Sequence, residues 1–268
     1  MRKDRPERKE SEVIGLIPAG GQAERLSPLP YSKELYPIGF ERTDAAATAR
    51  PKAVCEYLLE KMRQAGIERV YIVLRQGKRD IPAYLRDGAM LDMHIAYLMM
   101  NLPFGAPYTL DQAYPFVRDS LVALGFPDIL FGTENGFEQL LVKQAASGSD
   151  VVLGLFPTDR SEKVDMVDVE ADGKVRRIVI KPKQTSLRFT WGIAVWTPAF
   201  THYMHEYLKG RGATAAQQPE LFVGDVIQAA IHDGLQIEAV QVSKEPFLDI
   251  GTPDDLVRAL RDLVSRGK

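Results

Sequence analysis

A short segment near the start of the chain combines two glycines with two cations, as a phosphate site requires. The apolar run Val13–Ile17 leads into Ala19-Gly20-Gly21, and Arg25 and Lys33 follow in the same loop. Glycine has no side chain to keep a phosphate from backbone amides, and it tolerates positive φ. The spacing matches neither Gly-x-Gly-x-x-Gly nor the phosphate loop that ends in Lys-Ser/Thr. We interpret the segment as a polyphosphate loop of another kind; a tight turn with two solvated cations is the alternative.

Two aspartates from distant parts of the chain could together hold a metal ion. Asp128 closes an apolar strand-like run, and Asp249 follows Phe247-Leu248 just before Gly-Thr-Pro. Open α/β sheets bind ligands at the carboxyl ends of their strands. Mg²⁺ prefers oxygen ligands and is commonly bound by one or two carboxylates together with substrate phosphates. We predict that Asp128 and Asp249 meet and bind Mg²⁺; a simple turn at Asp128 and a helix-capping role for Asp249 are the alternatives.

The composition excludes several classes of protein. With 268 residues, 45% of them hydrophobic and 26% charged, the chain has the balance of a folded globular protein. Its formal net charge of −2 provides no global basic field for nucleic acid or for an anionic membrane, so a phosphate site must be local. No apolar run approaches the ~20 residues of a membrane span. The single cysteine, Cys55, excludes an internal disulfide, which fits a cytoplasmic location.

Apolar runs alternate with amphipathic stretches, a pattern typical of a doubly wound α/β fold with a mostly parallel, Rossmann-like sheet. In the first half we expect strands at Val13–Ile17, Val70–Leu74, Ile95–Met100, Leu121–Gly125 and Val151–Leu155, and helices near Ala53–Ala65, Asp80–Arg86, Tyr108–Val117 and Gly136–Ala146. Residues 41–50 show no apolar period and are predicted to form a mobile loop.

The second half has the pattern of a smaller α+β lobe. We expect a hairpin of Met166–Val169 and Val175–Ile180, strands at Phe189–Trp196, Ile237–Val242 and Phe247–Ile250, and helices near Pro198–Leu208, near Leu221–His232 and from Pro253. We therefore predict a charged, flexible leader over residues 1–11 and one domain over 12–262. Its first lobe covers about 12–156, its second lobe about 157–262, and residues 263–268 form a tail.

Four motifs, in this order, resemble those of the sugar-1-phosphate nucleotidyltransferases, which include the thymidylyl- and uridylyltransferases of glucose 1-phosphate. The glycine segment with Arg25 and Lys33 resembles the family signature. Gly125–Phe131 is similar to its strand-end Gly-Asp-Asn, Ile178–Pro182 to its Glu-Lys-Pro, and Phe247–Pro253 to its Trp-Leu-Asp-Thr-Gly-Thr. The resemblance extends from residue 12 to about residue 262. It implies that the first lobe, about 12–156, binds the nucleotide and that the second lobe, about 157–262, binds the sugar phosphate.

The resemblance implies an enzyme that transfers a nucleotidyl group from a nucleoside triphosphate, with dTTP or UTP slightly favoured, to a sugar-1-phosphate. It implies Mg²⁺ at Asp128 and Asp249, catalytic cations at Arg25, Lys33 and Lys181, a nucleotide site at Ala19, Gly20, Gly21, Asn101 and Gly105, and an acceptor site at Lys181, Trp191 and Gly192. No nucleic acid or membrane partner is implied, and a homo-oligomer is compatible with it.

Several positions depart from the family pattern. Met100 or Asn101 stands where a base-reading Gln is expected, Ile180 replaces the Glu that often meets sugar hydroxyls, and Val164-Asp165-Met166-Val167 replaces Tyr-Gly-Val-Val. Ile180 and Met166 predict an apolar, narrow acceptor pocket with weak selectivity for glucose 1-phosphate over deoxy sugars. Two other functions stay open: a non-catalytic sensor of nucleotide sugars, and a cytidylyltransferase acting on a non-sugar phosphate.

Overall fold

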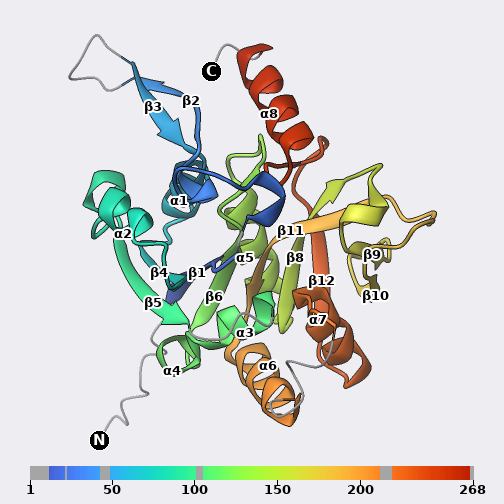
Figure 1. Cartoon of the computed structure of the whole chain (residues 1–268). Helices are drawn as coiled ribbons and strands as arrows, with labels where there is room; N and C mark the ends of the chain where they lie inside the picture. Colours follow the sequence, from blue (N-terminus) through green and yellow to red (C-terminus); the bar gives the residue numbers. More distant parts are fainter. Residues whose placement is uncertain (1–11, 22, 43–48, 101–104, 212–218, 266–268) are drawn as a thin grey trace, which may run out of the picture.

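The fold is described by a computed structural model that covers residues 12–21, 23–42, 49–100, 105–211 and 219–265. Its strands are β1 (Val13–Ala19), β2 (Pro37–Arg42), β3 (Ala49–Ala53), β4 (Arg69–Arg75), β5 (His94–Met100), β6 (Leu121–Gly125), β7 (Ile129–Leu130), β8 (Val151–Pro157), β9 (Met166–Val169), β10 (Val175–Val179), β11 (Phe189–Trp196), β12 (Ile237–Gln241) and β13 (Leu248–Asp249). Nine of them form one sheet, in which β10-β9-β11-β6-β1-β4-β5 are consecutive neighbours and β8 lies between β11 and β12 (Figure 1).

The first half of the chain supplies the parallel part of this sheet. β1 lies between β4 and β6 and is parallel to both, and β4 is parallel to β5. β11 runs antiparallel to β6, β8 and β9, so the sheet continues into the second half without a break. The predicted α/β class with a doubly wound sheet is confirmed, and the antiparallel strands belong to the stretch predicted as the smaller lobe.

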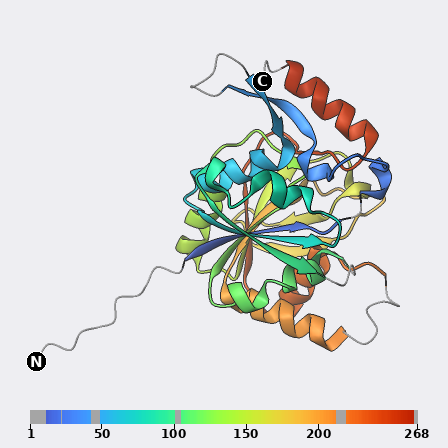
Figure 2. The same cartoon turned by 60° about the vertical axis from the view of Figure 1, so that its left-hand side comes forward.

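Helices cover both faces of the sheet, because its strands are apolar on both sides. One buried cluster joins the sheet to α3, α4, α6 and α7, and a second joins its other face to α1, α2 and α5 (Figure 2). These helices are α1 (Val54–Gln64), α2 (Asp80–Leu85), α3 (Ala106–Asp111), α4 (Tyr114–Val117), α5 (Gly136–Ser147), α6 (Pro198–Arg211) and α7 (Val223–His232). The helix expected at 108–117 is divided into α3 and α4, with Pro115 in the first turn of α4. In the described part of the chain, no helix is long and apolar enough to cross a membrane.

A third, smaller apolar cluster joins the β2–β3 hairpin to α8 (Pro253–Ser265) around Ile38, Val54 and Ala259. The expectation of a loop over residues 41–50 is wrong at both ends, because Glu41 pairs with Arg50 and Arg42 with Ala49 in the hairpin ladder. Backbone hydrogen bonds hold such a ladder together, so its sequence need not show the apolar periodicity by which a strand is recognised. Residues 43–48 lie outside the described part. α8 continues past residue 262, where the sequence predicted the domain to end.

A fully buried carboxylate, Glu56, ties the hairpin to α1 and α2. Its Oε1 accepts the Ala53 N–H at 2.8 Å and the Tyr84 hydroxyl at 2.6 Å, and its Oε2 lies 2.7 Å from Nη2 of Arg50. Glu56 has 0% exposure, so its charge depends on these partners in place of water.

We expect Glu56→Ala to lower the free energy of unfolding by about 3–5 kcal/mol, because it leaves Arg50 and two further donors without their buried acceptor. The urea midpoint, measured with the slope of the transition, checks this. Glu206→Ala removes a glutamate paired only at the surface of α6 and serves as the control, with a nearly unchanged midpoint. A midpoint that fell no further in Glu56→Ala than in this control would contradict the prediction.

Candidate active site

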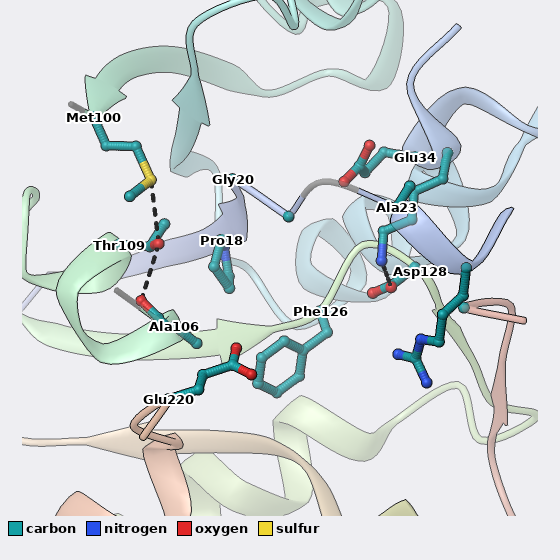
Figure 3. Close-up of a pocket in the computed structure, with 15 residues that line it drawn as sticks. Pro18, Gly20, Ala23, Glu34, Met100, Ala106, Thr109, Phe126, Asp128 and Glu220 are labelled. Atoms are coloured by element: carbon teal, nitrogen blue, oxygen red, sulfur yellow. Dashed lines mark hydrogen bonds and ion pairs between the residues drawn. The ribbon is translucent and has the colours of Figure 1, made fainter. Parts of the chain in front are cut away.

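A cavity of about 540 Å³ opens at the carboxyl ends of β1, β5 and β6. The strand order reverses at β1, between β4 and β6, and such switch points are where open α/β sheets bind ligands. Figure 3 shows Met100 and Thr109 at one end of the cavity, Asp128 at the other, and Phe126 between them. The lining residues include Pro18, Gly20, Gly21, Arg25, Lys33, Glu34, Gly105, Ala106, Glu220 and Gly251.

The predicted phosphate loop begins at the end of β1. Ala19 is buried as the last residue of that strand, whereas Gly20 and Gly21 line the cavity. A Cβ on Gly20 would lie 2.6 Å from Sδ of Met100, and a Cβ on Gly21 would meet nothing within 4 Å. Neither glycine is among those with positive φ. Gly20 therefore has to be a glycine because Met100 packs closely against it. At Gly21 the space above the backbone is open.

The two predicted metal ligands come together. β7 and β13 pair with Asp249 opposite Ile129, and the Ile250 N–H donates to the Asp128 carbonyl oxygen at 3.1 Å. The Gly251 N–H donates to Oδ1 of Asp249 at 2.7 Å. Lys33 forms an ion pair with the Asp128 carboxylate, and Arg25 lines the same cavity. The structure thus places Arg25, Lys33, Asp128 and Asp249 in one cluster.

The pKa shifts in this cluster follow from burial and from the nearness of the charges. Burial and the neighbouring Asp128 charge raise the pKa of Asp249, against the Gly251 N–H, Lys33 and Arg25. Burial alone would raise the pKa of Asp128, but Lys33 holds it below its usual value. Two carboxylates that repel one another at the end of a cavity are a suitable oxygen donor set for a divalent cation, whose charge would replace this repulsion by attraction.

Sequence reasoning missed a second ion pair behind this cluster. Glu34 and Lys78 are 2% and 6% exposed, and Nζ of Lys78 lies 2.5 Å from Oε1 of Glu34. Burial raises the pKa of Glu34 and lowers that of Lys78 in spite of the pairing. The sequence positions of the two residues could have indicated this pair: Glu34 directly follows Lys33, and Lys78 lies in the loop after the strand β4. Asp80, which accepts the N–H and hydroxyl of Ser32 at 2.6 and 2.7 Å, fixes the residue before Lys33.

The opposite end of the cavity is formed by the end of β5 and the start of α3. Thr109 donates its hydroxyl to Sδ of Met100 at 3.2 Å, so Met100 packs beside the diglycine. Gly105 precedes α3 with φ +109°, and a Cβ there would lie 2.4 Å from the Leu221 carbonyl oxygen. Asn101, the other candidate for reading the base, lies outside the described residues.

The predicted acceptor residues Lys181, Trp191 and Gly192 are not among the residues that line the cavity. Nζ of Lys181 lies 3.6 Å from the Phe222 ring centroid, and its backbone has φ +41°. Trp191 is buried behind Phe126, with ring centroids 5.8 Å apart, and Gly192 packs against Phe156 and Phe247 in the core. Met166 has 0% exposure, so the expectation that it narrows the acceptor pocket is wrong. Glu220, which the sequence did not single out, points toward Phe126 (Figure 3).

Proteins similar to this chain come from several organisms. It is 24% identical over 250 residues to the low-salt glycan biosynthesis nucleotidyltransferase Agl11 of Haloferax volcanii, covering 91% of this chain and 64% of that one. It is 24% identical over 268 residues to a UTP–glucose-1-phosphate uridylyltransferase of Synechocystis sp., covering 94% and 63%. The chain thus spans somewhat less than two thirds of the length of these curated relatives.

The fold is also found in a solved structure, a Bacillus anthracis protein described as a glucose-1-phosphate thymidylyltransferase in complex with a sucrose. The TM-score is 0.78 at 20% identity, and the match covers 94% of this chain and 95% of the other. The family model for nucleotidyl transferases matches residues 14–266. Because that match includes the diglycine loop and both aspartates at the cavity, and runs from the first strand through the last helix, the chain belongs to the nucleotidyl transferase family.

Proposed function

We propose that this protein transfers a nucleotidyl group from a nucleoside triphosphate to a sugar-1-phosphate and releases pyrophosphate. The observation that carries the proposal is the meeting, in and beside one cavity, of an open diglycine, the cations Arg25 and Lys33, and the neighbouring carboxylates of Asp128 and Asp249. The names of the uridylyl- and thymidylyltransferase relatives favour UTP or dTTP as the donor.

The chemistry asks the protein for positioning and charge neutralisation. A phosphate oxygen of the acceptor attacks the α-phosphorus, a new P–O bond forms, and the bond to the β-phosphate breaks. The attacking phosphate is already ionised at neutral pH, so no general base is required. Arg25 binds the departing β- and γ-phosphates, and Lys33 exchanges its pairing with Asp128 for the α-phosphate or the attacking phosphate. Lys181 binds the acceptor phosphate.

Asp128 and Asp249 would hold the Mg²⁺ that nucleoside triphosphates carry. When bound, the ion neutralises phosphate charge and orients the α-phosphate. The protein supplies two partly buried carboxylates that repel one another without a metal ion, and it supplies Lys33, which neutralises Asp128 before substrates bind.

The test of the proposal is pyrophosphate release. ATP, CTP, GTP, UTP and dTTP are each combined with a set of sugar and polyol phosphates in the presence of Mg²⁺. Release with a sugar-1-phosphate supports the proposal. Release only with CTP and a polyol phosphate would replace it by the cytidylyltransferase alternative, and release with none would favour a nucleotide-sugar sensor.

Asp128→Asn and Asp249→Asn should each lower kcat by roughly a hundredfold or more, or about 3–4 kcal/mol, since each removes a charge that positions the metal. The same variants should need more Mg²⁺ for half-maximal rate. Asp119→Asn, at an exposed position paired with Arg118, is the matched control and should retain full activity. Full activity of Asp249→Asn at ordinary Mg²⁺ would remove Asp249 from the metal site.

Arg25→Ala should lower kcat more than it weakens apparent triphosphate affinity, because the guanidinium is needed most as pyrophosphate departs. Steady-state kinetics with the triphosphate varied separate the two effects, and Arg118→Ala is a surface control of the same residue type. If only KM rose while kcat stayed constant, Arg25 would be a ground-state binding residue.

A further inference from the structure

Asp165, which directly precedes β9, is a partly buried aspartate with one buried and unused carboxylate oxygen. Its Oδ1 is shielded from solvent and has no hydrogen-bond partner among the described residues. The Gly224 N–H is the backbone donor that faces the carboxylate, at the first turn of α7. A buried acceptor left without a donor costs on the order of 1–3 kcal/mol, so proteins seldom keep one without a use for it.

Asp165 lies beside Ile180, the residue that stands in place of the family's Glu. A Cβ on Gly224 would lie 2.4 Å from Oδ2 of Asp165 and 2.7 Å from Cδ1 of Ile180. The Asp165 carboxylate and the Ile180 side chain therefore share the space over the start of α7, and only glycine at 224 leaves room for them. A carboxylate is thus present next to Ile180, although it comes from the residue before β9 and not from the end of β10.

The charged groups that face Asp165 come from two elements. Lys181, after β10, favours the ionised carboxylate, and Asp225, in α7, opposes it. Asp225 is itself engaged, since its Oδ2 accepts the Phe222 N–H at 2.9 Å. Burial is the largest influence and raises the pKa of Asp165 to about 6. At neutral pH the group is therefore mostly ionised in a site that does not favour its charge.

We propose that Asp165 determines acceptor specificity, with its free oxygen accepting a hydrogen bond from a hydroxyl of the acceptor sugar while Lys181 binds the sugar's phosphate. This inference rests on the proposed function. Lys181 is exposed, its ammonium lies over the Phe222 ring, and its charge acts on Asp165, so that one acceptor could contact both side chains. The weak selectivity expected from Ile180 alone is thereby reversed, because a site that hydrogen-bonds a hydroxyl discriminates far more strongly than an apolar one.

The experiment compares glucose 1-phosphate, or whichever sugar-1-phosphate the wild type uses best, with its singly deoxygenated derivatives. For each acceptor, kcat/KM is measured in wild type, Asp165→Ala, Asp165→Asn and Asp168→Asn. Asp168 is the matched control: it lies on β9, three residues away, and its carboxylate pairs with Arg177 on the neighbouring strand.

Wild type should disfavour one deoxy derivative by about a hundredfold or more, and Asp165→Ala should reduce that ratio to within about tenfold. The KM of Asp165→Ala for the triphosphate should stay within about twofold of the wild-type value. Asp168→Asn should have the same deoxy ratio and the same triphosphate KM as wild type. An unchanged ratio in an active Asp165→Ala would overturn the role of Asp165 while leaving the proposed function intact. No pyrophosphate from wild type with any sugar phosphate would instead overturn the proposed function itself.

The pH dependence of the melting temperature provides a second readout, because replacing an aspartate with a purely structural role would lower Tm at pH 8. Because the native pKa of about 6 exceeds the ordinary value of 3.8, the folded state binds the Asp165 proton more tightly, and stability falls as pH rises from about 4 to about 6. Asp165→Asn should lose this part of the pH dependence and should have an equal or higher Tm at pH 8 than wild type. A Tm lowered at pH 8, together with an unchanged deoxy ratio, would assign Asp165 a structural role only.

Discussion

The ion pair between Lys33 and Asp128 is the contact on which the candidate site depends. It joins the loop after β1 to the turn after β6, and it keeps a partly buried carboxylate charged at the place that we propose for the metal ion. Asp80 fixes the loop through Ser32, and the Glu34–Lys78 pair anchors the residue that follows Lys33. Under the proposed function, Lys33 neutralises Asp128 before substrates bind and is released to a phosphate when the metal ion takes over its role toward Asp128.

Much of the fold could be predicted from the sequence where burial produces a pattern. β1, β4 and β6 are covered on both faces and appear as continuous apolar runs. The edge strand β5 is partly exposed but still consists mainly of apolar residues, and all four strands were predicted to within two residues. The β2–β3 hairpin was missed since its stability comes from backbone pairing and from Glu56 with Arg50, a contact between residues that no periodicity connects. The periodicity of apolar residues predicts the elements that pack in the sheet and against it. It does not predict an element that is held by a polar network.

The candidate site shows the same division. Arg25, Lys33, Asp128 and Asp249 were identified by type and spacing, and the structure brings them together. The residues of the acceptor side were harder to predict from the sequence. Successive side chains of a strand point to opposite faces, so an error of one residue replaces a surface position by a core position. Met166 was placed at the acceptor, but it points into the core, and the preceding Asp165 lies beside Ile180 instead. Only the three-dimensional neighbourhood of Gly224 shows that the carboxylate was moved and not lost.

The two sides of the site differ in their balance of charge. At the Asp128 end, the cations Arg25, Lys33 and Lys78 are balanced by the carboxylates of Glu34, Asp128 and Asp249, and Lys33 and Lys78 form ion pairs with two of them. The acceptor side combines one cation, Lys181, with the carboxylates of Asp165 and Asp225 and, at the cavity edge, Glu220. A second polyphosphate would be repelled there, whereas a ligand with one phosphate and several hydroxyls offers a partner to both signs of charge. Under the proposed function, this difference in charge favours the nucleoside triphosphate with its metal ion at the Asp128 end and the sugar phosphate on the side of Lys181, before any contact with the base or the sugar ring is made.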